Sequence, residues 1–217
     1  MSSSASNAAS AASTTTSSMS NTVSLGAGCY WGTEKFIKSD FQKRFPNSLK
    51  TARVGFMSPE KDHPKNPSYN AVCTGKTGHV EVLNVELNDP ETHFRELIKF
   101  FFFFHDPTTK DKQGNDAGTQ YASAIFVRDE EQKRIVNEVI DELQQSLKHA
   151  KKSPYSGSKM ATAVHDATTF FDAEEAHQEY LTKNPSGYCN HYMRMQEWPQ
   201  NDGENGDKKE KKKWFNR

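Results

Sequence analysis

The apolar residues of this chain recur at two spacings, and each spacing predicts a different kind of element. Alternation typical of a half-buried strand marks residues 80–87, and a short apolar run at 23–25 is typical of a strand as well. Residues 121–127 indicate another long strand, and residues 161–165 a short one. We therefore expect strands that are well separated along the chain.

Apolar residues at helical spacing predict a helix after each of these strands. The helix after residues 80–87 would be capped by Asp89 or Thr92. Further helices are predicted at 129–148 and 173–183. The stripes are Ile37, Phe41 and Phe45 in the first helix, Phe94, Leu97, Ile98, Phe101 and Phe104 in the second, and Val136, Val139, Ile140, Leu143 and Leu147 in the third.

Strands separated by helices imply an α/β (α+β) fold built as a two-layer sandwich. A polar loop at 105–120 is long enough to indicate function. Residues 1–21 are rich in Ser, Ala and Thr and carry no charge, so we expect them to be disordered. Residues 201–217 form a lysine-rich flexible tail in this interpretation, which leaves one catalytic domain at 22–200.

Composition excludes several classes of protein. The formal net charge is zero, so nothing global favours nucleic acid or an anionic membrane, and no apolar run approaches the roughly 20 residues that span a bilayer. The three cysteines are too widely spaced for a structural zinc site, and no secretory signal suggests a disulfide framework. We expect a cytoplasmic location without a bound metal, and the lysine run at 208–213 is compatible with a nuclear location.

Cys29 is the first candidate for chemistry, because it lies where a strand passes into a helix through a glycine-rich turn. At a helix start, free N–H groups and the macrodipole stabilise a thiolate and lower the thiol pKa from roughly 8.5. A thiolate is the nucleophilic form of cysteine. The sequence therefore predicts a cysteine nucleophile, and Tyr30 and Trp31 beside it predict a pocket wall.

Glu81 is the second candidate. Strand alternation places it on the same face as Leu83, Val85 and Leu87, which are apolar. A carboxyl group desolvated in this way has a raised pKa and suits general-acid catalysis. The alternative is that Glu81 lies at the strand end and reaches water.

Other polar residues have both a functional and a structural interpretation. Tyr69 and Tyr121 carry hydroxyls that could donate to a polarised oxygen, although tyrosines more often pack in a core. Asp116 lies in the glycine-rich loop, where an Asx-turn is the default. Cys73 fits an inert packed thiol, while Cys189 lies in a segment suited to a resolving cysteine or to a merely exposed one.

A histidine base would turn Cys29 into the nucleophile of a hydrolase or an acyl-transferase. No spacing selects one histidine for this role, and structural hydrogen bonding is the default for all of them. A thiol that senses oxidation without turnover is a further alternative. The candidate bases are His79, His105, His177 and His191.

Four segments of the chain resemble, in order, the A-type peptide methionine sulfoxide reductases, and the resemblance covers residues 23–195. Each segment alone is a weak signal, and the shared order and compatible spacings make the resemblance specific. The segments are GCYWG at 28–32, SYNAVCTG at 68–75 with TGHVEV at 77–82, HDPTT at 105–109 with QGNDAGTQY at 113–121, and residues 170–181.

The resemblance implies a ferredoxin-like core with long wrapping loops, and an enzyme that reduces free and peptide-bound methionine (S)-sulfoxide. It implies that Cys29 attacks the sulfur and that Glu81 protonates the oxygen. The residues that would bind the substrate are Tyr69 and Tyr121 at the oxygen, Asp116 on the polar side, and Tyr30 and Trp31 around the S-methyl group.

The resemblance also implies how the enzyme is recycled. A sulfenic acid on Cys29 would condense with Cys189 to a disulfide, and thioredoxin, or dithiothreitol in vitro, would reduce it. Cys73 is the alternative resolver. The partners would be oxidised proteins, free methionine sulfoxide and thioredoxin, acting on a monomer without a bound cofactor. The chain departs from the family pattern at Tyr30, where Phe is usual, and at 54–58, which would form a loop of different shape.

Overall fold

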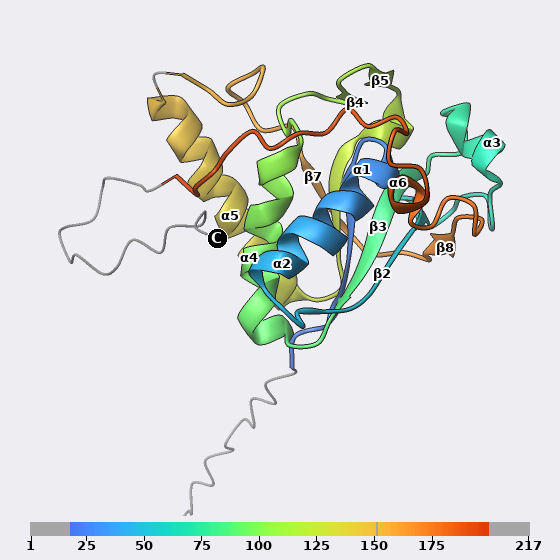
Figure 1. Ribbon diagram of the computed structural model, residues 1–217, viewed down its shortest axis with the longest axis horizontal. Helices are drawn as coiled ribbons and strands as arrows, with labels where there is room; N and C mark the ends of the chain where they lie inside the picture. Colours follow the sequence, from blue (N-terminus) through green and yellow to red (C-terminus); the bar gives the residue numbers. More distant parts are fainter. Residues whose placement is uncertain (1–17, 151, 200–217) are drawn as a thin grey trace, which may run out of the picture.

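One of the two central strands of the sheet, β1, ends at Ala27, two residues before Cys29. The computed structural model describes residues 18–150 and 152–199, and within them a six-stranded sheet has the order β7-β6-β1-β3-β2-β8 (Figure 1). All neighbouring strands are antiparallel except β6 and β7. The strands are β1 (Thr22–Ala27), β2 (Leu49–Met57), β3 (Val80–Leu87), β6 (Ser123–Val127), β7 (Ala163–Asp166) and β8 (Phe171–Asp172).

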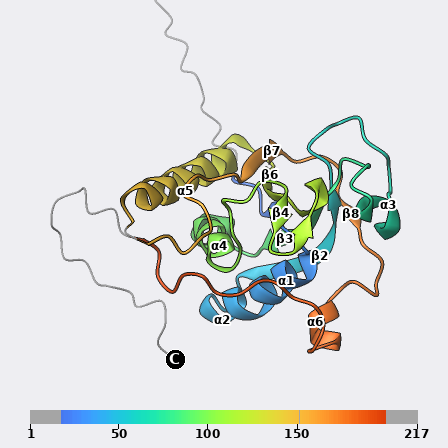
Figure 2. The ribbon, with the colours of Figure 1, turned by 90° about the horizontal axis from the view of Figure 1, so that it is seen from above.

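The long helices cover one face of this sheet, which gives the two-layer arrangement that the sequence predicts (Figure 2). A continuous helical stretch contains α1 (Tyr30–Lys35), the π-helical η1 (Phe36–Phe41) and α2 (Gln42–Arg44). It lies beside α4 (Pro90–Phe104), which in turn packs against α5 (Glu130–His149). The order β1-α1-β2-β3-α4-β6 is the ferredoxin-like β-α-β-β-α-β unit, so the predicted fold class is confirmed.

Both long helices begin where the sequence indicates. The carboxylate of Asp89 accepts a hydrogen bond from the Thr92 N–H, so Asp89 is the N-cap of α4 and Thr92 is its capped residue. Asp129 caps α5 in the same way by accepting from the Gln132 N–H at 2.8 Å. None of the helices in the described ranges is long and apolar enough to cross a membrane.

The core is densest at the end of α4, where every residue from 100 to 104 is a buried phenylalanine. A helix turn that is apolar on all sides needs neighbours on all sides. Phe36 stacks on Phe104 at a centroid distance of 5.1 Å, and Trp198 stacks on Phe103 from the C-terminal segment. This packing holds the helix that begins at Cys29 against the rest of the domain.

The predicted helix at 173–183 is wrong over most of its length. Only α6 (Tyr180–Lys183) is helical, and residues 175–179 form turns. Gln178 explains the difference, because its side chain binds the main chain of β2. Its Oε1 accepts from the Val54 N–H at 2.9 Å, and its Nε2 donates to the Val54 carbonyl at 2.8 Å. The buried side-chain amide of Gln178 therefore pairs with the main chain of β2. A continuous helix at 173–183 would not place this side chain against Val54.

Smaller differences concern segments expected to be irregular. Residues 54–57, expected in a loop, belong to β2 and pair with β3. The loop at 105–120 holds a short hairpin, and the strand expected from Tyr121 begins at Ser123. Residues 18–21, assigned above to the disordered segment, include the buried Met19, and the rest of both tails lies outside the described residues. The short elements are α3 (Tyr69–Cys73), β4 (Lys112–Gln113), β5 (Asp116–Ala117) and the 3-10 turn η2 (Thr119–Tyr121).

We expect Gln178→Leu to lower the free energy of unfolding by about 1–3 kcal/mol, because it leaves the Val54 N–H unpaired in a buried position. Urea denaturation at neutral pH measures the change. The matched control is Gln145→Leu on the exposed face of α5, which should stay within about 0.5 kcal/mol of wild type. Equal stability of the two variants would show that Gln178 does not secure this edge of the sheet.

Candidate active site

Cys29 lies at the junction of β1 and α1, as the sequence predicts. Gly28 makes the turn with a φ of +88°, and a Cβ there would lie 2.4 Å from the Cβ of Gln113, so only glycine fits. Cys29 is the N-cap residue of α1, one position before the first helical turn. Its side chain is buried, with 8% of the residue exposed.

Glu81 faces Cys29 from the neighbouring strand β3. Its Oε2 accepts a hydrogen bond of 3.1 Å from the backbone N–H of Tyr30, the residue after Cys29. Leu83, Val85 and Leu87 lie in the helix-facing core, whereas Val80 and Val82 lie in the cluster on the other face. Glu81 is only 2% exposed, so the prediction that it is desolvated beside an apolar face is confirmed.

Burial decides the protonation states of both groups. Desolvation raises the pKa of Glu81 from its usual 4.5 to about 8, against the lowering effect of the Tyr30 N–H. The pKa of Cys29 is raised as well, first by burial and then by the charge of Glu81. The expectation of a lowered thiol pKa is therefore wrong for the substrate-free site, since the Trp31 N–H at the helix start lowers it by less than burial raises it.

Aromatic rings form one side of the site. The Tyr30 ring lies 5.8 Å from the rings of both Phe56 and His177. Trp31 stacks on Tyr180 with a centroid distance of 3.8 Å and lies nearly parallel to His177 at 5.7 Å. Tyr30 and Trp31 thus lie in one cluster of aromatic rings beside Cys29, and their role as the wall of a substrate pocket stays a prediction. The Tyr30 hydroxyl is buried, and no protein atom among the described residues bonds it.

Tyr69 and Tyr121 reach the same place from two distant segments. Tyr69 begins α3 and Tyr121 ends η2, and both are half-buried. Burial is the main cause that raises their pKa values, and the charge of Glu81 raises them further, so both hydroxyls stay protonated and lie near that carboxyl. Cys73 lies beside both tyrosine hydroxyls, so it is a third thiol at the edge of the site rather than an isolated core cysteine.

Asp116 lies at the start of β5 and faces residues 185–199, named here the C-terminal strap. Its Oδ1 accepts from the Tyr188 hydroxyl at 3.0 Å, and its Oδ2 accepts from the Asn190 side-chain amide at 2.8 Å. Burial raises the pKa of Asp116 despite these bonds. Cys189 lies between these two residues, and its thiol affects the pKa of Cys29. Asp116 is thus bound to the segment that carries Cys189.

The histidines do not serve Cys29 as a base. His105 is fully buried and bonds the Phe101 carbonyl and the Ser123 hydroxyl, and His79 bonds the Thr77 carbonyl. His191 bonds the Ala27 carbonyl, and His177 lies in the aromatic wall. No hydrogen bond among the described residues joins a histidine to Cys29. The same residues also hold no group of three or more His, Cys, Asp or Glu side chains that could bind a metal ion.

Sequence analysis gave no role to Tyr180, Tyr188 and Asn190, and it considered His177 only as a base. All four residues lie in or after the segment whose helix prediction is wrong, so their faces could not be assigned from periodicity. The sequence signal that could have pointed to His177 was the fourth segment of the family resemblance, residues 170–181, which contains it. A cavity of about 230 Å³ is lined by Trp31, and none of the other predicted site residues lines it.

The fold and the site define a class of protein. A buried cysteine next to a protonated carboxyl group, with no histidine base, is the arrangement of a thiol-dependent oxidoreductase rather than of a cysteine hydrolase. A family model described as "Peptide methionine sulfoxide reductase" matches residues 21–209. The chain belongs to the peptide methionine sulfoxide reductase family.

Individual relatives agree with this assignment. The peptide methionine sulfoxide reductase of Saccharomyces cerevisiae is 39% identical over 177 residues, which are 79% of this chain and 89% of that protein. A probable peptide methionine sulfoxide reductase of Schizosaccharomyces pombe is 40% identical over 174 residues, with coverages of 78% and 94%. The predicted reductase function is confirmed, and the hydrolase alternative is not supported.

Solved structures agree as well. Mxr1 from Saccharomyces cerevisiae in reduced form is similar with a TM-score of 0.68 and 37% identity, over 82% of this chain and 93% of that chain. Methionine sulfoxide reductase A of Corynebacterium diphtheriae is similar with a TM-score of 0.57 and 31% identity, over 78% and 77% of the two chains. The likeness therefore extends over nearly the whole described domain.

The raised pKa of Glu81 makes a prediction about stability. The folded protein keeps a proton on Glu81 that the unfolded chain releases above pH 4.5, so this group's contribution to stability is full below pH 4.5 and is lost as pH rises through about 8. We expect Glu81→Gln, which keeps an acceptor for the Tyr30 N–H, to match wild type at pH 4.5 and to be more stable at pH 8.5. Urea unfolding at both pH values tests this, and parallel stability curves would contradict it.

Proposed function

We propose that this chain reduces methionine (S)-sulfoxide, free and in proteins, with Cys29 as nucleophile and Glu81 as general acid. One observation carries the proposal. The buried Glu81 carboxyl approaches the start of α1 within 3.1 Å of the Tyr30 nitrogen and has a pKa of about 8, so it holds a proton at neutral pH beside the only thiol buried with it among the described residues. Cleavage of an S–O bond needs such a proton.

In the first step Cys29 attacks the sulfoxide sulfur while Glu81 protonates the sulfoxide oxygen. The proton of the Cys29 thiol passes to Glu81 as a transient S–S bond forms between Cys29 and the substrate. The S–O bond of the substrate and this S–S bond then break as the hydroxyl transfers to the Cys29 sulfur, which leaves methionine and a sulfenic acid on Cys29. The sulfoxide is reduced to methionine and the thiol is oxidised, so no external electron source is needed in this step. A protonated Glu81 also removes the negative charge that raises the pKa of Cys29.

The surrounding residues orient the substrate. The protonated hydroxyls of Tyr69 and Tyr121 lie near Glu81 and would donate to the sulfoxide oxygen. Tyr30 and Trp31 would pack on the S-methyl group, which leaves the polar side of the substrate toward Asp116. This division of the site into an apolar wall and a row of donors suits one configuration at sulfur.

In the second step the Cys189 thiol attacks the sulfenic acid, water leaves, and a Cys29–Cys189 disulfide forms. The half-buried position of Cys189, close enough to affect the pKa of Cys29, supports this assignment. A dithiol then reduces the disulfide by exchange. We propose thioredoxin for this role in cells, from the resemblance of the chain to its family, and dithiothreitol replaces it in vitro.

Cys29→Ser should abolish reduction of both free and protein-bound methionine sulfoxide, because no other thiol among the described residues occupies the attacking position. The assay follows dithiothreitol-dependent reduction of the two separated epimers of an N-blocked methionine sulfoxide. The wild type should consume the S epimer alone. Turnover by the Cys29→Ser variant, or equal consumption of both epimers by wild type, would contradict the proposal.

Glu81→Gln should lower the rate of methionine formation by about 10²–10⁴-fold, because the amide keeps the Tyr30 hydrogen bond but has no acidic proton. The wild-type rate should fall as pH rises through about 8, where Glu81 loses its proton, and the variant should lack this limb. Single-turnover rates from pH 6 to 9.5 measure both effects. A variant that keeps wild-type rates would remove Glu81 from the mechanism.

A further inference from the structure

His191 ties the C-terminal strap to the turn that carries Cys29. Its Nε2 lies 2.6 Å from the carbonyl oxygen of Ala27, two residues before Cys29, and must donate because the carbonyl accepts. His191 itself lies two residues after Cys189, and the residue is 7% exposed. This hydrogen bond therefore joins the two cysteine-bearing segments. Each of its two residues lies two positions along the chain from a cysteine.

The imidazole fits only because position 32 is a glycine. A Cβ on Gly32 would lie 2.1 Å from Nδ1 of His191 and 2.8 Å from two ring carbons, which is closer than such atoms approach. The ring therefore rests directly on the backbone of α1, in the turn that follows Cys29. Burial lowers the pKa of His191 to about 4, so the ring is neutral at physiological pH and keeps the tautomer that donates to Ala27.

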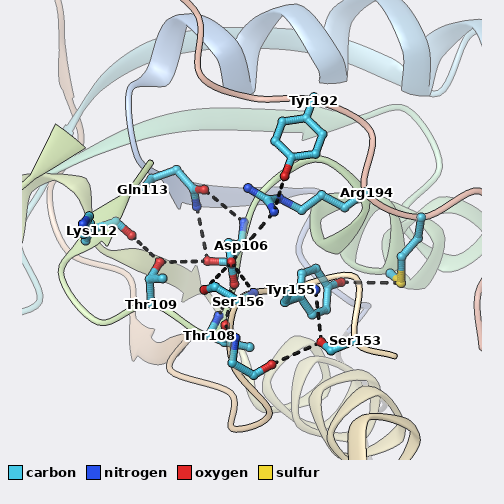
Figure 3. A network of polar contacts seen from close by, with 12 residues as sticks. Asp106, Thr108, Thr109, Lys112, Gln113, Ser153, Tyr155, Ser156, Tyr192 and Arg194 are labelled. Atoms are coloured by element: carbon cyan, nitrogen blue, oxygen red, sulfur yellow. Dashed lines mark hydrogen bonds and ion pairs between the residues drawn. The ribbon is translucent and has the colours of Figure 1, made fainter. Parts of the chain in front are cut away.

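The strap is anchored on both sides of His191 and is more exposed before it. Before His191, the side-chain amide of Asn190 donates to the Gln113 carbonyl at 2.6 Å and to Asp116 at 2.8 Å. Downstream, the Arg194 N–H donates to the Phe103 carbonyl at 2.7 Å, and the Arg194 guanidinium lies 3.8 Å from Asp106. Figure 3 shows that Asp106 also accepts hydrogen bonds from Thr108 and Ser156. Upstream, residues 182–190 are all exposed or half-buried. His191 is thus the first fully seated side chain after Cys189.

We propose that His191 is the positioning residue that holds Cys189 in reach of Cys29 for disulfide formation. The proposal rests on the function proposed above for both cysteines. In the step concerned, the Cys189 sulfur forms a bond to the Cys29 sulfur, the S–O bond of the sulfenic acid breaks, and the thiol proton leaves with the hydroxyl as water. The Cys189 thiol donates to the main-chain carbonyl of His191 at 3.8 Å, and the imidazole acts by fixing this end of the strap.

Two variants separate this role from catalysis at Cys29. His191→Phe keeps a ring but removes the donor to the Ala27 carbonyl. Gly32→Ala keeps the imidazole but places a methyl group in the space that the ring occupies. With one equivalent of sulfoxide and no reductant, both should still form methionine. Disulfide formation should slow by about ten-fold or more, which corresponds to about 1.4 kcal/mol of lost positioning. Quenching with dimedone and mass spectrometry would show the sulfenic acid accumulating on Cys29.

Controls keep the test decisive. Tyr192→Phe changes the neighbouring exposed residue of the strap. It removes the hydroxyl that Arg194 bonds but keeps the ring beside the Arg194 guanidinium, and it should leave both steps at wild-type rates. His191→Gln restores a side-chain N–H donor and should recover part of the rate of disulfide formation. Circular dichroism melts check that each variant is folded.

The outcomes distinguish the two proposals. Wild-type rates of disulfide formation in both His191→Phe and Gly32→Ala would overturn the role of His191, and so would an equal loss of both steps in the folded variants. Failure of wild type to form methionine without reductant would instead overturn the proposed function of Cys29.

Discussion

The hydrogen bond between the Tyr30 N–H and the Glu81 carboxyl group joins the two halves of the site. It connects the start of α1 to β3 across the middle of the sheet, and both ends of it are buried. The bond needs β1 and β3 to be neighbours, because β1 delivers the chain to Cys29 and β3 presents Glu81. The ferredoxin-like strand order places β1 and β3 together, so the site depends on the fold at this contact.

Desolvation outweighs the helix start at Cys29. A helix N-terminus contributes typically 0.3–1 kcal/mol toward a nearby anion, and burial of a charge costs more than that. The substrate-free site therefore holds a protonated thiol and, at neutral pH, a mostly protonated carboxyl. In the proposed mechanism, a sulfoxide oxygen accepts the proton of Glu81, and this proton transfer makes the site reactive.

The sequence was informative wherever local physics decides the structure. The strand at Val80–Leu87, the start of the helix near Asp129 and the apolar face beside Glu81 follow from alternation and helical spacing, and all were predicted, while capping preferences narrowed the cap of α4 to Asp89 or Thr92. The segment at 173–183 failed because its conformation depends on Gln178 bonding a strand more than a hundred residues earlier. The prediction of a lowered pKa for Cys29 failed for the same reason, since the burial that raises this pKa depends on tertiary packing and no local sequence pattern reports it.

In the proposed mechanism, burial of Cys29 also explains why a second cysteine on a separate segment is useful. Cys29 is only 8% exposed, so a protein reductant has little access to it. A disulfide between Cys29 and the half-buried Cys189 places one oxidised sulfur nearer the surface. A dithiol can then attack this sulfur by exchange. The segment that carries this cysteine must be fixed enough to meet Cys29 and open enough to meet a partner. A strap seated at His191 and exposed on the side before Cys189 satisfies both requirements.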